Sequence, residues 1–468
     1  MGTTSVDVLT IGAGGGAYPA AFRLASAGLT VVMVDPKGVM SGNCLAEGCV
    51  PSKAVREMAH HMNRSVRFRE FGIEGGSAVD YARIVLHKDR VQKTRYAQHQ
   101  KELEAMSNIR LLKGHARFLD AHTLLVDHGK GSERIKSRYV IVASGADIFI
   151  PPIPGASRCL TSRDFFALNP SVTDIPESLA IVGGGYIGVE TAAMYRILGS
   201  AVTVFESSEE ILGGVETSLV RELRSLLDPS IRILTEVSVD EIRKSDCGFE
   251  VRYRKRRVAE GRESAMEVLF VQKVMIAAGR HPVIPEGTER LGVGIGSRGI
   301  LVNPAMQTAV PHIFATGDVN GITPLFHAAV RQSIVAAHNI LGGERSCDQF
   351  DASSVPTTIF TIPAVSYVGI TEDRAREQGL SVLKGEYRYS EDSRAQILGE
   401  PGGGIRLLFE SGSLRLIGGS VVGVDAGNLI GEIGLALSGG MTAYDLARFA
   451  DQHPMASEGI GKAARSLL

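Results

Sequence analysis

The most regular pattern in the chain is an apolar run that ends in a cluster of glycines, and it occurs twice. Residues 6–11 and residues 179–182 are mostly apolar, and glycine follows each run directly. A short apolar run with such a boundary is typical of a buried strand. In both copies a stretch with helical periodicity follows, and then a second apolar run at residues 29–34 and 201–205. This internal repeat predicts two strand–helix–strand units.

Further patterns extend the two units and predict a third, different region. Residues 139–146 and 274–280 are apolar runs that end in small residues, and we expect each to close one unit as a buried strand. Residues 80–106 carry apolar residues at helical spacing among many charged ones, which predicts a long, solvated helix without a chemical role. After the repeated units the apolar positions alternate, as in residues 405–410 and 414–424, before a helical end. We interpret this last part as an α+β module that serves self-association.

The predicted fold class is α/β, with two Rossmann-like dinucleotide-binding domains followed by a C-terminal α+β dimerisation domain. The proline-rich residues 151–155 are a natural connection between the first two domains. We predict domain boundaries at 1–150 for the first dinucleotide-binding domain, 151–278 for the second, 279–345 for a central domain, and 346–468 for the interface domain.

Both glycine clusters match the dinucleotide fingerprint G-x-G-x-x-G/A. The first copy holds Gly12, Gly14 and Ala17 with the acid Asp35, and the second holds Gly183, Gly185 and Gly188 with the acid Glu206. Each acid lies 23 residues after the first glycine, near the spacing at which a carboxylate binds ribose hydroxyls. Glycine lets the chain turn sharply and lets a pyrophosphate approach backbone N–H groups at a helix N-terminus. Pro19 lies early in the first helix, so we expect that helix to start late or to bend.

The composition excludes several classes of partner. The 468 residues carry a formal net charge of −1, which gives no general attraction to nucleic acid or to an anionic membrane. No apolar run approaches the ~18 residues that span a bilayer, and five cysteines are too few for a secreted disulfide framework. We therefore expect a cytoplasmic protein with no nucleic-acid partner, no membrane partner and no bound metal.

Two of the cysteines, Cys44 and Cys49, follow the first fingerprint closely, and this position suggests a redox-active disulfide beside a bound dinucleotide. In an ideal α-helix their Cα atoms would lie roughly 8–9 Å apart, beyond the ~7 Å limit for a disulfide, so a bond needs a distorted turn. Gly42 and Gly48 bracket the pair with flexible backbone. The alternative is two buried thiols that never join, because free cysteine usually behaves as a small hydrophobic residue. If the charge of Glu47 faces the sulfur atoms, it should raise the pKa of the thiols by like-charge repulsion.

With these features together, the chain resembles the pyridine nucleotide–disulfide oxidoreductases over nearly its full length, and among them the dihydrolipoamide dehydrogenases. The motifs that carry the resemblance are the two fingerprints and residues 44–53, 312–318 and 453–458. The resemblance implies FAD on the first fingerprint, NAD on the second, and a homodimer. It implies that FAD contacts Gly12, Gly14, Ala17, Asp35, Lys53, Ser144, Gly145 and Asp318, and that NAD contacts Gly183, Gly185, Gly188, Glu206 and Gly279.

The resemblance also implies roles for the reactive side chains. Cys44 would be the outer thiol that exchanges with substrate sulfur, while Cys49 would lie against the flavin. Only a thiolate is a good nucleophile, so a base is required, and His453 from the opposite subunit would supply it with Glu458 orienting the imidazole ring. Lys53, paired with Glu190 from the second fingerprint helix, would place positive charge near the flavin.

The reaction that this resemblance implies is the oxidation of dihydrolipoyl groups to lipoyl disulfide with reduction of NAD+ to NADH. Glu206 favours NAD, because a carboxylate at this position repels the 2′-phosphate of NADP. Two alternatives stay open: an NAD(P)H-dependent reductase of another disulfide, similar to glutathione reductase or mercuric reductase, and a redox-sensing flavoprotein without turnover. Several residues depart from the usual pattern and leave the lipoyl-bearing carrier protein open, namely Asn43, Ala46, Glu47, Gln332, Ser333, Ala364 and Asn428.

Overall fold

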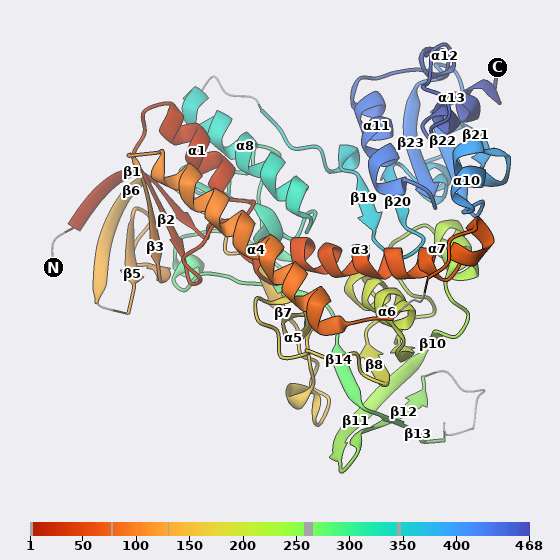
Figure 1. Ribbon diagram of the computed structural model, residues 1–468. Helices are drawn as coiled ribbons and strands as arrows, with labels where there is room; N and C mark the ends of the chain where they lie inside the picture. Colours follow the sequence, from red (N-terminus) through yellow and green to blue (C-terminus); the bar gives the residue numbers. More distant parts are fainter. Residues whose placement is uncertain (1–2, 76–77, 130, 257–264, 344–347) are drawn as a thin grey trace.

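The first dinucleotide unit is a mixed sheet, whose parallel part is completed by a strand from later in the chain and whose strands β5 and β4 continue antiparallel beyond β6. The computed structural model describes residues 3–75, 78–129, 131–256, 265–343 and 348–468. Strands β3, β2, β1 and β6 are neighbours in that order and run parallel, and β18, from far along the chain, adds a parallel strand beside β6. Helix α1 connects β1 to β2 and packs against α8 (Figure 1). The bounds are β1 Thr3–Ile11, α1 Tyr18–Ser26, β2 Val31–Asp35, β3 Ile109–Lys113, β4 His115–Phe118, β5 Thr123–Asp127, β6 Ser132–Val142, β18 Ile313–Ala315 and α8 Phe326–Gly342.

The second unit repeats this arrangement on a smaller scale. Strands β10, β9, β8 and β14 form a parallel sheet, and α6 connects β8 to β9. An antiparallel meander of β11, β12 and β13 extends from this unit, away from the first sheet (Figure 1). The bounds are β7 Ala146–Ile148, α5 Ser162–Phe166, β8 Ser178–Val182, α6 Tyr186–Leu198, β9 Ala201–Phe205, α7 Thr217–Leu226, β10 Arg232–Leu234, β11 Val237–Ser245, β12 Gly248–Lys255, β13 Glu267–Val271, β14 Lys273–Ile276, β15 Arg280–Pro282, β16 Ile295–Gly296 and β17 Gly299–Ile300.

The C-terminal part is an antiparallel sheet with helices. Strands β19, β20, β23, β22 and β21 are neighbours in that order, and α11 packs on β20 and β23. The alternating runs 405–410 and 414–424 correspond to β22 and β23, so the α+β prediction for this region is confirmed. The bounds are β19 Thr357–Ile359, β20 Val365–Gly369, α9 Glu372–Glu377, β21 Val382–Arg388, α10 Ser393–Leu398, β22 Gly404–Glu410, β23 Leu416–Val422, α11 Ala426–Ser438, α12 Ala443–Ala447 and α13 Glu458–Arg465.

Between β2 and β3 of the first unit the chain forms three helices, and the first two contain Cys44 and Cys49. They are α2 at Gly42–Glu47, α3 at Cys49–Ser65 and α4 at Tyr81–Glu104. The long helix predicted at residues 80–106 is confirmed as α4, and Asp80 caps it by accepting a hydrogen bond from the Arg83 N–H at 3.1 Å. However, the prediction that α4 is only a solvated helix is wrong. The side chains of Lys88, Gln92 and His99 are buried, and all three make hydrogen bonds.

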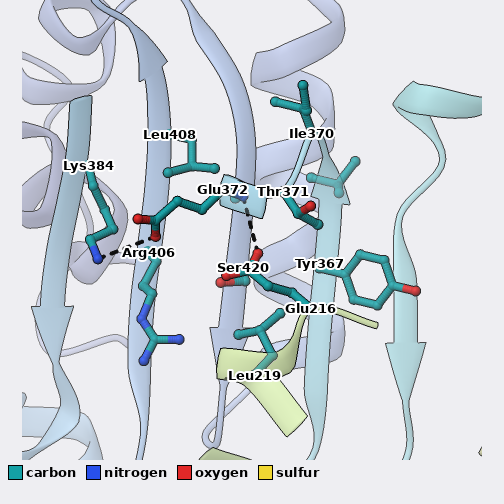
Figure 2. Close-up of a pocket in the computed structure, with 12 residues that line it drawn as sticks. Glu216, Leu219, Tyr367, Ile370, Thr371, Glu372, Lys384, Arg406, Leu408 and Ser420 are labelled. Carbon is teal, nitrogen blue, oxygen red and sulfur yellow. Dashed lines mark hydrogen bonds and ion pairs between the residues drawn. The ribbon is translucent and has the colours of Figure 1, made fainter. Parts of the chain in front are cut away.

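One pocket lies between α7 and the sheet of the C-terminal part. Figure 2 shows Glu216 and Leu219 from the α7 side facing Tyr367, Arg406 and Ser420 from the strands. None of its lining residues belongs to the fingerprints or to the reactive set predicted from the sequence. Within the described part of the chain, no helix combines the length and the apolarity that crossing a membrane requires.

Candidate functional site

The first fingerprint forms a tight turn that only glycine tolerates at its start. Gly12 has φ +109°, and a Cβ atom there would lie 2.2 Å from the carbonyl oxygen of Ala143. At Gly14 the nearest atom to such a Cβ would be 3.7 Å away, so this position leaves room for a ligand to approach the backbone. The Asp35 carboxylate accepts a hydrogen bond from the Ala13 N–H at 3.2 Å and thereby ties the end of β2 to the glycine turn. Helix α1 begins late, as Pro19 predicted, with the proline in its first turn.

The second fingerprint has the same kind of tight glycine turn, tied to an acidic residue. Gly183 has φ +115°, and its Cβ would lie 2.3 Å from the carbonyl oxygen of Ala277, while Gly185 has no neighbouring atom within 4 Å of a Cβ. Glu206 accepts hydrogen bonds from the Gly184 N–H at 2.8 Å and the Ser208 N–H at 2.7 Å. Burial opposes ionisation of Glu206, but these two N–H groups hold its pKa below the ordinary value. Both acids therefore brace their glycine turns by accepting backbone hydrogen bonds.

The other predicted cofactor residues follow the ends of neighbouring strands. Ser144 and Gly145 lie just beyond β6, which ends at Val142, and Gly145 has φ +73°. Asp318 lies just beyond β18, where burial raises the pKa of its carboxyl group and Arg280 opposes the rise. Gly279 follows β14 with φ +116°. Ligands of open α/β sheets bind at the carboxyl ends of the strands, so the turn at Gly12, the open Gly14 and the groups after β6 and β18 together fit a dinucleotide such as FAD. Gly279 instead follows a strand of the second sheet, with the residues predicted for NAD.

The two cysteines lie on either side of a break between helices. Helix α2 ends at Glu47 and α3 begins at Cys49, and Gly48 between them has φ −126° and ψ −111°. The distorted turn expected between the cysteines is therefore present. Both residues are free thiols in this structure, with Cys44 half-buried and Cys49 exposed.

Hydrogen bonding between the two sulfur atoms gives the thiols different acidities. The thiol of Cys44 donates to the sulfur of Cys49, which raises the pKa of Cys44 and lowers that of Cys49 to about 7. Although the Cys49 residue as a whole is exposed, desolvation of its sulfur atom works against the lowered pKa. The Lys53 ammonium supports the lowered pKa, and the Glu190 carboxylate opposes it. Near neutral pH the reduced pair therefore holds a large share of Cys49 as thiolate, which the neutral thiol of Cys44 stabilises.

A cation is held next to this thiolate by the second unit. The Lys53 Nζ atom lies 2.7 Å from the Glu190 Oε2 atom, so the ion pair expected from the sequence is present. The same Nζ atom lies 4.4 Å from the centre of the Phe360 ring, and the Phe360 N–H donates to the other oxygen of Glu190 at 2.9 Å. Glu190 lies in α6, so the second fingerprint helix fixes the position of the charge beside Cys49.

The predicted base lies in a different part of the fold. The His453 Nδ1 atom and the Glu458 Oε1 atom are 2.8 Å apart, and the histidine side chain is 68% exposed. Burial opposes ionisation of Glu458, but His453 and Lys462 hold the pKa of that carboxyl below its ordinary value. Among the interactions of the described residues within one chain, none joins His453 to Cys44 or Cys49.

Glu47 does not act as the sequence suggested. Its Oε2 atom lies 3.0 Å from the Nε atom of Arg163 and 3.5 Å from the Nζ atom of Lys37, and its side chain is only 5% exposed. Two cations neutralise the carboxylate, and the causes that shift the pKa of the cysteines do not include Glu47. We therefore correct the expectation that Glu47 raises the pKa of the thiols.

The sequence reasoning missed three residues of α4, two of which contact residues 41–46 around Cys44 while the third supports one of them. Gln92 donates hydrogen bonds to the main chain of α2, Lys88 binds Gln92, and the ring of His99 lies 2.9 Å from the Ser41 hydroxyl. In the sequence these residues are visible only as polar residues on one stripe of a helix, and the structure shows that this stripe is buried.

Comparison with known proteins agrees with this geometry. Residues 6–333 match the family described as pyridine nucleotide-disulphide oxidoreductase, and residues 355–464 match its dimerisation domain. Dihydrolipoyl dehydrogenase from Geobacillus stearothermophilus is 31% identical over 99% of this chain and 96% of its own length. The enzyme of the same name from Haloferax volcanii is 33% identical over 99% of this chain and 97% of its own length.

Two solved structures share the fold over nearly the whole chain. The flavoprotein disulfide reductase RclA from Escherichia coli, described as HOCl-induced and solved as a Cu(II) complex, is 25% identical with a TM-score of 0.86 and covers 99% of this chain and 100% of its own. LpdA from Mycobacterium tuberculosis is 22% identical with a TM-score of 0.88, again over 99% of this chain and 100% of its own. On the family match and the full-length relatives, the chain belongs to the pyridine nucleotide–disulphide oxidoreductase family.

Proposed function

We propose that this flavoprotein oxidises dihydrolipoyl groups to lipoyl disulfides and transfers the electrons to NAD+. As a member of its family the protein uses FAD and NAD(H). The observation that carries the proposal is the pair Cys44 and Cys49 with unequal acidity beside the Lys53–Glu190 ion pair. Relatives at 31–33% identity over 99% of the chain, which are named dihydrolipoyl dehydrogenase, support this choice of substrate.

In the proposed reaction the chain starts with Cys44 and Cys49 joined as a disulfide. His453 removes a proton from one substrate thiol, and the resulting thiolate attacks the sulfur of Cys44, which breaks the protein disulfide and releases Cys49 as a thiolate. The second substrate thiol then loses its proton and attacks the substrate sulfur of the mixed disulfide. The lipoyl disulfide leaves, Cys44 takes up this second proton as a thiol, and the first proton stays on His453. Two electrons have moved from the substrate to the protein.

FAD, bound at the first fingerprint, supplies the redox chemistry that passes these two electrons on to NAD+. The chain contributes by making the thiol of Cys49 more acidic than an ordinary cysteine. With a pKa of about 7, roughly half of the Cys49 side chains are thiolates at neutral pH. Lys53 would also place positive charge near the flavin, which becomes more negative as it takes up electrons. Glu190 holds the Lys53 ammonium in place.

We further propose that the nicotinamide cofactor is NAD rather than NADP, that the protein is a homodimer, and that it is located in the cytoplasm. Glu206 is a carboxylate at the end of β9, where it suits a free 2′-hydroxyl and repels a 2′-phosphate. The match to a dimerisation domain supports the homodimer, as do the exposed apolar side chains of Leu435, Tyr444 and Phe449 in that region. Because His453 does not reach the cysteines within one chain, we propose that the partner subunit supplies it.

The test is an anaerobic assay of the purified flavoprotein with two substrate pairs. We expect NADH to form from dihydrolipoamide and NAD+, with little turnover of NADPH and oxidised glutathione. The variant His453→Gln should lose activity by about 10²–10⁴-fold, since a general base contributes that much. Turnover only with NADPH and oxidised glutathione would replace the proposed substrate.

A reductase of another disulfide is the second candidate. The likeness to RclA, which is named a flavoprotein disulfide reductase, favours it. The same assay separates the two, because a reductase would consume NADH with a different disulfide and turn over dihydrolipoamide slowly. A redox-sensing protein without turnover would show neither reaction while remaining yellow with bound flavin.

A further inference from the structure

The break between α2 and α3 leaves backbone groups that a continuous helix would have paired. In an unbroken helix the carbonyl oxygens of Leu45 and Ala46 would accept from the N–H groups of Cys49 and Val50, four residues on. Those two N–H groups instead donate to the sulfur of Cys44. The two carbonyl groups are among the last four of α2, which have no partner inside their own helix.

Gln92 from α4 supplies the missing donors. Its Nε2 atom lies 2.9 Å from the carbonyl oxygen of Leu45 and 3.0 Å from that of Ala46. The Gln92 side chain is fully buried, so water does not compete for these carbonyl groups. An unpaired carbonyl in such a place would cost free energy comparable to a lost hydrogen bond. The amide therefore stabilises the broken backbone at the point where helix continuation would otherwise be favoured.

Lys88 fixes which end of the Gln92 amide faces α2. The Lys88 Nζ atom donates to the Gln92 Oε1 atom at 2.9 Å and to the Ala167 carbonyl oxygen at 2.6 Å. Asp89 lies 2.5 Å from the same ammonium, so the buried cation has a counter-ion. Because a lysine can only donate, the NH₂ group of Gln92 must point at the two carbonyl groups. Lys88 also ties this arrangement to the main chain beyond α5, which ends at Phe166.

We propose that Gln92 is a positioning residue for the redox reaction, because its buried amide keeps α2 from merging with α3 and so keeps Cys44 within bonding distance of Cys49. This inference rests on the proposed role of the two cysteines as a reversible disulfide. A continuous helix would separate their Cα atoms by roughly 8–9 Å, beyond the reach of a disulfide. The disulfide form requires the break, whereas the dithiol form can exist with or without it. Loss of the amide therefore favours the dithiol.

The test is the thiol–disulfide equilibrium of the holoenzyme in anaerobic buffers of reduced and oxidised dithiothreitol. In this exchange dithiothreitol loses two protons and closes to its cyclic disulfide, while the S–S bond between Cys44 and Cys49 breaks. Cys44 takes up one of the protons, and the other is shared between Cys49 and the buffer. After acid quenching and alkylation, mass spectrometry counts free thiols at the two positions. We expect Gln92→Met to raise the ratio of dithiol to disulfide about tenfold at a given buffer ratio, because two hydrogen bonds that support the disulfide form are lost. For a two-electron couple this is a rise of about 30 mV in reduction potential.

Two further variants make the result interpretable. Gln100→Met changes the same residue type on the exposed side of α4 and should leave the ratio unchanged. Gln92→Glu keeps the size of the side chain and the contact with Lys88 but has no N–H donor, so it should shift the ratio in the same direction if Gln92→Met does not fold. A folded variant at position 92 with the wild-type ratio would overturn the inference. A wild-type protein that forms no disulfide in any buffer would instead overturn the proposed function.

Discussion

At the residue scale, the chemistry of the site depends on a charge balance around Cys49. The lowered pKa of this thiol results first from the hydrogen bond with Cys44 and then from Lys53, while burial and Glu190 oppose it. Lys53 and Glu190 form one ion pair but act on the thiolate in opposite directions. Removing Lys53 should therefore raise the pKa of Cys49, and removing the charge of Glu190 should lower it.

The pH dependence of thiol alkylation should follow that sign. In the reduced wild-type protein, the rate of Cys49 alkylation should rise as pH increases through about 7, because only the thiolate reacts. Lys53→Met should move the midpoint up by about one pH unit, since it removes the stabilising cation and leaves the Glu190 charge behind. Glu190→Gln should move it down. Stopped-flow alkylation with iodoacetamide, with peptide mass spectrometry to assign the site, measures all three midpoints, and equal midpoints would refute the charge balance.

At the element scale, the repeated strand–turn–helix units were predictable because glycine spacing and apolar runs are local features. Residues 6–11 and 179–182 correspond to the last part of β1 and to β8, and each is followed by a turn at positive φ. The role of α4 was not predictable from charge alone, because its buried polar groups match carbonyl groups of α2 that lie far away in sequence. The ion pair of Glu47 was missed for the same reason, since Arg163 comes from α5.

The two kinds of glycine in a fingerprint should respond differently to alanine. Gly183→Ala places a Cβ 2.3 Å from a carbonyl oxygen at φ +115° and should destabilise the protein by about 2 kcal/mol or more. Gly185→Ala, at φ −74° and without a neighbour within 4 Å, should fold normally but bind NADH about tenfold more weakly, because its methyl group blocks the pyrophosphate. Urea unfolding and fluorescence titration with NADH measure the two effects. Equal stability of both variants would contradict this division of roles.

At the scale of the whole molecule, the proposed active site is incomplete in one chain. Helix α3, which begins at Cys49, packs against α6 of the second nucleotide unit. Glu458 instead begins α13, and His453 precedes that helix, in the C-terminal part (Figure 1). The four domain ranges that we predicted remain a proposal, but β18 shows that residues from the central region complete the first sheet. The sequence motifs predicted both groups of residues, the cysteine pair and the His453–Glu458 pair. Their separation within one chain became visible only in three dimensions.

Subunit mixing tests the shared site. Cys44→Ser and His453→Gln should each inactivate a homodimer. A heterodimer of the two variants would contain one site with both substitutions and one site with neither, so it should recover about half of the wild-type activity per dimer. Purification through two different affinity tags isolates the mixed dimer for the assay. An inactive mixed dimer, with FAD bound at the normal level, would show that each chain builds its own site.

The central claim is that Cys44 and Cys49 open and close as electrons pass from dihydrolipoyl groups to NAD+. The most direct measurement counts alkylatable thiols at these two positions under anaerobic conditions, first after adding dihydrolipoamide alone and again after adding NAD+. The account predicts that two thiols appear per subunit in the first step and disappear in the second, with NADH formed in proportion. A thiol count that stays constant through both additions while NADH accumulates would contradict it.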